Sequence, residues 1–66
     1  MSRVRKVRRG HYLTLQELGQ QIGVRQSLLT MIERRDRRAR PDVQAALSSF
    51  FGIPATVLFD SASFAR

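Results

Sequence analysis

Hydrophobic residues recur along this chain at the spacing of short amphipathic helices. Leu15, Leu18 and Ile22 occupy positions i, i+3 and i+7 of one helical face, and the residues after Pro41 follow the same period. No segment alternates hydrophobic and polar residues as a strand does, and no Asn-Gly pair marks a hairpin. The pattern predicts an all-α fold, a compact bundle of five short helices. The expected helices cover residues 2–9, 14–22, 25–34, 41–51 and 54–59, within a domain of residues 1–60, and a polar tail covers residues 61–66.

Capping and turn residues set the expected ends of these helices. Thr14 and Glu17 predict a capping box, in which the Thr14 hydroxyl accepts from the Glu17 backbone N–H and the Glu17 carboxylate accepts from the Thr14 N–H. Gly10 and Gly23 are expected to close the first and second helices, because glycine adopts the left-handed conformation easily. The short connection at Gly23 predicts that the second and third helices cross at a steep angle, and Gly19 allows their close approach.

The length and charge of the chain limit the classes of protein to which it can belong. The chain has 66 residues, 12 Lys and Arg, five Asp and Glu and no cysteine, so it makes one small domain without disulfides or a Cys-based zinc site. No apolar run approaches the ~20 residues of a membrane span, and no signal peptide is visible, which predicts a cytoplasmic protein without a membrane partner. A net charge of +7 predicts a folded domain that binds a polyanion.

The sequence offers little that catalysis requires. His11 is the only histidine and has no cysteine or second histidine with which to bind a metal ion. The four glycines lie far apart, so they form no phosphate-binding loop. We therefore expect neither an enzyme nor a small-molecule substrate, cofactor or metal.

The segment TLQELGQQIGVRQSLLTMIERR resembles the helix-turn-helix of the Cro and phage-repressor (XRE) family. The similarity begins at Arg8 and continues through PDVQAALSSFFGIPATVLF, so it covers nearly the whole chain. It implies a lambda-repressor-like fold in which the second and third helices form the helix-turn-helix. It also implies a bacterial or phage-encoded protein whose partner is double-stranded DNA.

The resemblance implies that the helix beginning near Gln26 enters the major groove. Glutamine pairs with adenine, arginine with guanine, and methionine and threonine methyl groups contact the thymine methyl. The alternative is that Gln26 and Ser27 only solvate the start of the helix. The implied base-contacting residues are Arg25, Gln26, Ser27, Thr30 and Met31.

The resemblance also implies phosphate contacts and a structural ion pair. In the family, the loop after the recognition helix lies along the DNA backbone, whereas the same charge run taken alone is equally consistent with a solvated loop. Leu15 stands where the family commonly has a phosphate-contacting glutamine. Glu33 matches a family glutamate that pairs with an arginine at the position of Arg8. The implied phosphate-contacting residues are Thr14, Gln16, Arg34, Arg35, Arg37, Arg38 and Arg40, and the N-terminal cations Arg3, Arg5, Lys6 and Arg9 either reach a flanking phosphate or strengthen the attractive field.

Hydrophobic residues near the end of the chain suggest a dimer. A single module buries only ~600–1,000 Å² on DNA, so such domains generally bind as two-fold homodimers on palindromic sites. The alternative is that Leu58 and Phe59 complete the core of one subunit. The candidate interface residues are Ile53, Val57, Leu58, Phe59 and Phe64.

These features favour a sequence-specific transcriptional regulator, and in particular a repressor. Two other functions remain open at this point. One is an architectural protein that binds DNA with weak sequence selectivity. The other is a protein-interaction module of an antitoxin or a phage or plasmid system.

Overall fold

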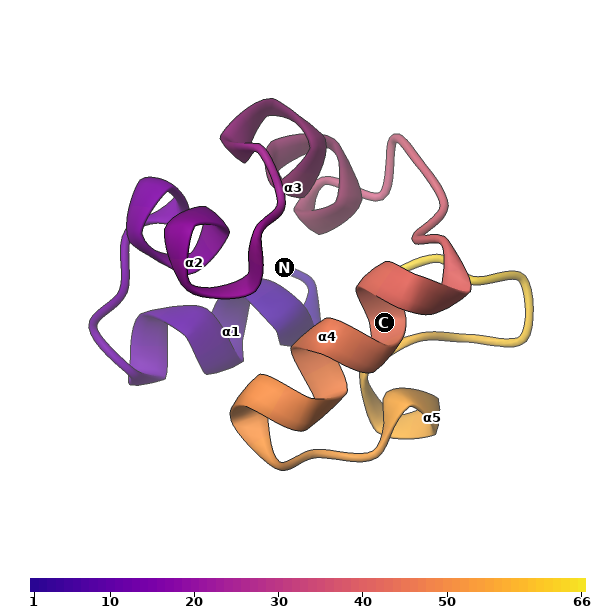
Figure 1. Ribbon diagram of the computed structural model, residues 1–66. Helices are drawn as coiled ribbons and strands as arrows, with labels where there is room; N and C mark the ends of the chain where they lie inside the picture. Colours follow the sequence, from indigo (N-terminus) through magenta and orange to yellow (C-terminus); the bar gives the residue numbers. More distant parts are fainter.

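The computed structural model describes all 66 residues and confirms the all-α prediction. As Figure 1 shows, α2 and α3 lie on one side of α1, and α4 and α5 cover the other side. None of the five helices combines the length and the hydropathy that a membrane-spanning segment needs. The helices are α1 (Arg3–Gly10), α2 (Leu15–Ile22), α3 (Gln26–Glu33), α4 (Pro41–Phe51) and α5 (Ala55–Leu58).

The predicted capping box forms at the start of α2. The Glu17 backbone N–H donates to the Thr14 hydroxyl over 3.0 Å, and the Thr14 backbone N–H donates to the Glu17 carboxylate over 2.9 Å. The backbone N–H of Thr14 and then its side chain hold the pKa of Glu17 below its usual value. The capping box therefore contributes stability at neutral pH that is lost as the pH falls through this lowered pKa.

The turn between α1 and α2 differs from the predicted one. Gly10 belongs to α1, and Tyr12 instead adopts the left-handed conformation, with φ of 58°. His11 is the C-cap residue that follows the helix, and its ring lies 5.1 Å from the ring of Phe51. The first helix therefore ends near Gly10 as predicted, but the left-handed residue of the turn is Tyr12 and not the glycine.

The turn between α2 and α3 agrees with the predicted one. Gly23 closes α2 with φ of 72°. Gly19 lies against this turn, where an added Cβ would collide with the Val24 carbonyl oxygen. Glycine at this position therefore lets α2 and the start of α3 approach each other closely, as the sequence predicts.

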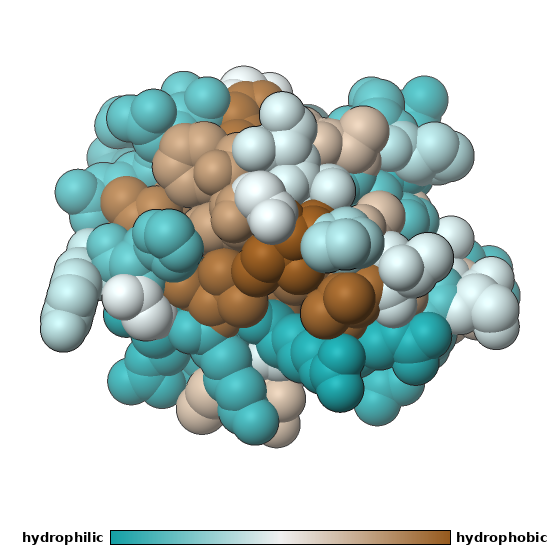
Figure 2. Space-filling view, turned by 90° about the horizontal axis from the view of Figure 1, so that it is seen from below, coloured by the Kyte–Doolittle hydropathy of each residue, from teal (hydrophilic) through white to brown (hydrophobic).

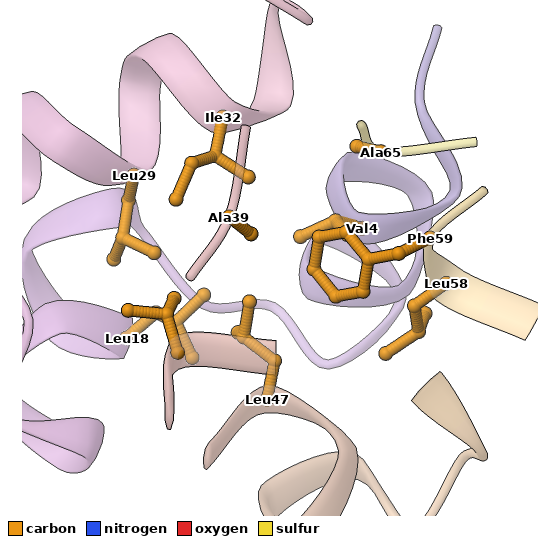
Figure 3. Packing of buried hydrophobic residues seen from close by; sticks show 10 residues of the cluster. Val4, Leu18, Leu29, Ile32, Ala39, Leu47, Leu58, Phe59 and Ala65 are labelled. Carbon is orange, nitrogen blue, oxygen red and sulfur yellow. The ribbon is translucent and has the colours of Figure 1, made fainter. Parts of the chain in front are cut away.

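Every helix contributes to a single hydrophobic core (Figure 3). Leu29 and Ile32 of α3 are fully buried in it, so one face of α3 is fixed and the opposite face remains exposed. The buried hydrophobic residues are Val4, Leu18, Leu29, Ile32, Ala39, Val43, Leu47, Leu58, Phe59 and Ala65.

Residues 59–66, which we call the terminal loop, fold back onto the domain. The sequence analysis treats residues 61–66 as a polar tail, but Ala65 is fully buried and pairs with Phe59 in an isolated β-bridge. The Arg66 backbone N–H donates to the Leu58 carbonyl over 2.9 Å, and the Arg3 N–H donates to the Arg66 carbonyl. Burial of Phe59 and Ala65 enlarges a small core and explains the departure from a polar tail.

A buried ion pair connects α1 to the end of α3. Two nitrogens of the Arg8 guanidinium donate to the Glu33 carboxylate, Nε over 2.7 Å and Nη2 over 3.0 Å. The third nitrogen, Nη1, donates to the Leu13 carbonyl over 2.8 Å. Only 11% of the Arg8 side chain and 4% of the Glu33 side chain are exposed. This ion pair, which the family resemblance implies, fixes α3 against α1 and the turn that follows it.

Replacing Glu33 by glutamine should lower the free energy of unfolding by about 3 kcal/mol, because the buried Arg8 charge then lacks its partner. Urea unfolding followed by circular dichroism measures this loss. Asp36→Asn is the matched control, since Asp36 pairs with Arg34 at the surface, and it should cost less than about 1 kcal/mol. Equally small losses in both variants would show that the buried pair does not hold the domain together.

Candidate nucleic-acid interface

The exposed face of α3 begins with three polar side chains. Arg25, which precedes the helix, and Gln26 and Ser27, which open it, are all exposed. Arg25 occupies the N-cap position without capping the helix through its side chain, so its guanidinium is free of the helix end. The start of α3 therefore presents three polar side chains to solvent.

The second turn of α3 presents less polar side chains. Thr30 and Met31 are half-buried, and the Thr30 hydroxyl donates to the Gln26 carbonyl over 3.0 Å. Because a hydroxyl has only one proton, Thr30 offers a ligand an acceptor and a methyl group rather than a donor. The structure thus places all five predicted base-contacting residues on α3 or directly before it.

A hollow between α2 and α3 adds a residue that the sequence analysis missed. Gln16 and Gln20 of α2 line it together with Arg25 and Gln26. Gln20 follows Gln16 by four residues, a spacing that places both on one face of a helix and is a signal visible in the sequence. The hollow therefore brings three glutamine amides beside one arginine.

Two of the predicted phosphate-contacting residues lie at the start of α2. Thr14 and Gln16 are exposed, and the Thr14 hydroxyl already accepts from the Glu17 N–H. Leu15 is half-buried and packs against the hydrophobic core. The replacement of the family glutamine by Leu15 therefore removes a polar contact and adds core packing.

Residues 34–40, which we call the arginine loop, connect α3 to α4. Three carboxylates lie near its arginines: the exposed Asp36 at 3.4 Å from Arg34, the half-buried Asp60 at 3.7 Å from Arg35 and the exposed Asp42 at 3.8 Å from Arg40. Arg37 and Arg38 form no ion pair and carry the uncompensated charge of the loop. All five arginines of the loop, Arg34, Arg35, Arg37, Arg38 and Arg40, are exposed.

The first turn of the arginine loop is a Schellman motif that closes α3. The Asp36 N–H donates to the Met31 carbonyl over 2.9 Å, and the Arg35 N–H donates to the Ile32 carbonyl over 3.1 Å. The motif needs a left-handed residue, and Arg35 supplies it with φ of 62°. A side chain at such a position costs roughly 1–2 kcal/mol relative to glycine. Arg35 thus has a strained backbone conformation at the edge of the exposed face.

Arg5 is a second residue that the sequence analysis did not single out from its cluster. It lines a hollow with Thr30 and Arg34, next to the buried Arg8–Glu33 pair. Arg5 lies three residues before Arg8 in α1, so it extends the same helical face outward. The basic surface beside α3 therefore includes α1 as well as the arginine loop.

The structure corrects part of the predicted dimer surface. Leu58 is fully buried and Phe59 is 2% exposed, so their side chains complete the core of one subunit and are not available to a second subunit. Ile53 and Phe64 are half-buried, and Val57 is exposed. These three residues remain candidates for an interface.

The fold and this surface define a DNA-binding domain, since a helix with an exposed polar start is held by a core and flanked by a basic loop. The helix-turn-helix family matches residues 4–58. The chain belongs to this family, in its Cro/C1 (XRE) type, which consists of DNA-binding transcription regulators. Searches of curated proteins and of solved structures found no match.

Replacing Arg35 by glycine should raise the free energy of unfolding by about 0.5–1 kcal/mol, because glycine adopts the left-handed backbone without side-chain strain. Loss of the exposed contact with Asp60 offsets only part of this gain. Thermal unfolding followed by circular dichroism measures the change. Arg37→Gly, at a residue without positive φ, is the control and should lower stability by about 0.5–1 kcal/mol. A loss of stability in both variants would contradict the strain assigned to Arg35.

Proposed function

We propose that this protein is a sequence-specific transcriptional repressor that binds double-stranded DNA in the major groove. The observation that carries this proposal is the exposed polar start of α3, formed by Arg25, Gln26 and Ser27, on a helix that is anchored by the fully buried Leu29 and Ile32. A rigid helix start presents its side chains to base edges in one orientation. Such a protein acts where the chromosome is accessible, in the cytoplasm of a bacterial cell.

The side chains at the start of α3 match the donors and acceptors of base pairs. Gln26 pairs with adenine through N6 and N7, and Arg25 pairs with guanine through O6 and N7. Met31 and the methyl group of Thr30 suit the thymine methyl. These contacts would select the sequence, because each base pair presents a different pattern in the major groove.

The surrounding basic residues would fix the position of the protein on the DNA backbone. Thr14 and Gln16 lie at the start of α2, where the positive end of the helix dipole favours a phosphate. The arginine loop lies at the other end of α3. Phosphate contacts on both sides of α3 would set its angle in the groove without selecting a sequence.

A homodimer would allow two copies to read a palindromic operator. The domain measures 27 × 22 × 22 Å, which is shorter than one turn of DNA at about 34 Å. Figure 2 shows the molecule from below the orientation of Figure 1. Hydrophobic residues gather across the middle of the face seen in this view. Phe50 and Val57 are each 39% exposed, and Ile53 is half-buried between their helices. We propose that these three residues form the dimer contact, and that repression follows when the dimer occupies a promoter.

Selection of bound duplexes from a random library should give a two-fold symmetric motif, bound about 10³-fold more tightly than a scrambled duplex. On the selected duplex, Gln26→Ala should reduce discrimination at one or two base pairs by about 1–3 kcal/mol each. Arg38→Ala should weaken binding to all sequences alike and lower the salt slope by about one unit. Fluorescence anisotropy over a range of salt measures both effects.

The outcome of this comparison separates the candidate functions. Identical effects of the two substitutions on every sequence would exclude base reading and leave an architectural DNA-binding protein. Absence of binding to any duplex would exclude both DNA functions.

Replacing Val57 by glutamate should raise the dimer dissociation constant at least tenfold, about 1.4 kcal/mol, because the interface would bury an unpaired charge. Sedimentation equilibrium measures the change. Ala62→Glu adds the same charge at an exposed residue of the terminal loop and should leave dimerisation unchanged. A dimer that tolerates Val57→Glu as well as Ala62→Glu does not use this surface.

A further inference from the structure

The terminal loop lies directly beside the arginine loop. Figure 1 shows the two segments running next to each other on the same side of the domain. The helix-turn-helix family match ends at Leu58, so the terminal loop lies outside the part of the chain that the family describes. Its contacts with the arginine loop therefore involve residues that the family match does not cover.

Three contacts join the two loops. The Ala39 backbone N–H donates to the Ser63 carbonyl over 2.9 Å. The Arg35 guanidinium lies 3.7 Å from the Asp60 carboxylate. The Arg38 guanidinium carbon lies 5.2 Å from the centre of the Phe64 ring, within the range of a cation–π contact. The arginine loop is thus held at its backbone and at two of its side chains.

Hydrogen bonds within the terminal loop fix the backbone of Phe64. The Asp60 carboxylate oxygen Oδ1 accepts from the N–H groups of Ala62 and Phe64, over 2.9 and 3.0 Å. The Asp60 N–H in turn donates to the Phe64 carbonyl over 2.8 Å. Both polar backbone groups of Phe64 are thus bonded to Asp60, so the backbone that carries the ring is fixed beside Arg38.

A cation–π contact differs from an ion pair because it leaves the N–H donors and the charge of the arginine available to a ligand. A carboxylate partner occupies N–H groups of a guanidinium and neutralises its charge, as Glu33 does for Arg8. The Phe64 ring contacts Arg38 without accepting from its N–H groups, and Arg38 forms no ion pair. The donors and the full charge of Arg38 therefore remain available to a phosphate.

We propose that Phe64 is a positioning residue that orders Arg38 before DNA binds. This inference rests on the proposed DNA-binding function and deepens it. Ordering the long Arg38 side chain in the free protein reduces the conformational entropy lost on binding. Because the partner of Arg38 is a phosphate, the gain applies to every DNA sequence equally.

A double-mutant cycle on DNA affinity tests this inference. Phe64→Leu should weaken binding to the selected and scrambled duplexes alike, by about two- to fivefold, the size of an exposed cation–π contact. The same substitution should have no further effect in an Arg38→Ala background and its full effect in an Arg37→Ala background. Arg37 is the matched control because it is the other loop arginine without an ion pair. Phe64→Tyr keeps a ring and should bind like the wild type.

A measurement on the wild-type protein covers the case in which Phe64→Leu does not fold. The Arg38 side-chain protons should show upfield NMR shifts from the Phe64 ring in the absence of DNA, and unshifted protons would overturn the proposal. Equal effects of Phe64→Leu in the two arginine backgrounds would also overturn it, while the proposed function would stand. Wild-type protein that binds neither duplex would instead overturn the proposed function, and this inference with it.

Discussion

Arg8 and Glu33 form the contact on which the orientation of α3 depends. Leu29 and Ile32 anchor α3 through hydrophobic packing, which resists separation more strongly than it resists small rotations. The ion pair is directional, because both charges are removed from water and few geometries satisfy both groups. Arg8 also holds the Leu13 carbonyl, so one side chain fixes α1, the following turn and the end of α3. The directions of the exposed α3 side chains therefore depend on this ion pair.

Local signals explain why the helices were predictable. Thr14 and Glu17 act on each other within one turn, and Gly23 closes α2 through its own backbone conformation. The terminal loop follows instead from contacts between distant parts of the chain. Ala65 lies in the core, where it pairs with Phe59, and Arg3 donates to the carbonyl of the residue that follows it. A polar composition at residues 61–66 gave no indication of this burial.

The candidate site also has one part that could be predicted from the sequence and one part that could not. The face of α3 could be predicted, because the position of Gln26 at a helix start follows from the helix-turn-helix pattern. The contacts of Arg35 with Asp60 and of Arg38 with Phe64 could not be predicted, since they join segments more than 20 residues apart. The strained backbone of Arg35 could not be predicted from the sequence either, because its positive φ depends on how α3 ends. Sequence therefore indicated the residue types of the loop but not their surroundings.

The carboxylates beside the arginine loop have a consequence for how the protein searches DNA. Asp36, Asp42 and Asp60 act as counterions that the chain carries with it. In the proposed complex a phosphate would compete with them for Arg34, Arg35 and Arg40, and this competition would weaken binding to every sequence by a similar amount. The base-edge contacts proposed for α3 would not be affected by this competition. The protein would therefore leave random DNA sooner and spend a larger share of its time sampling new sites.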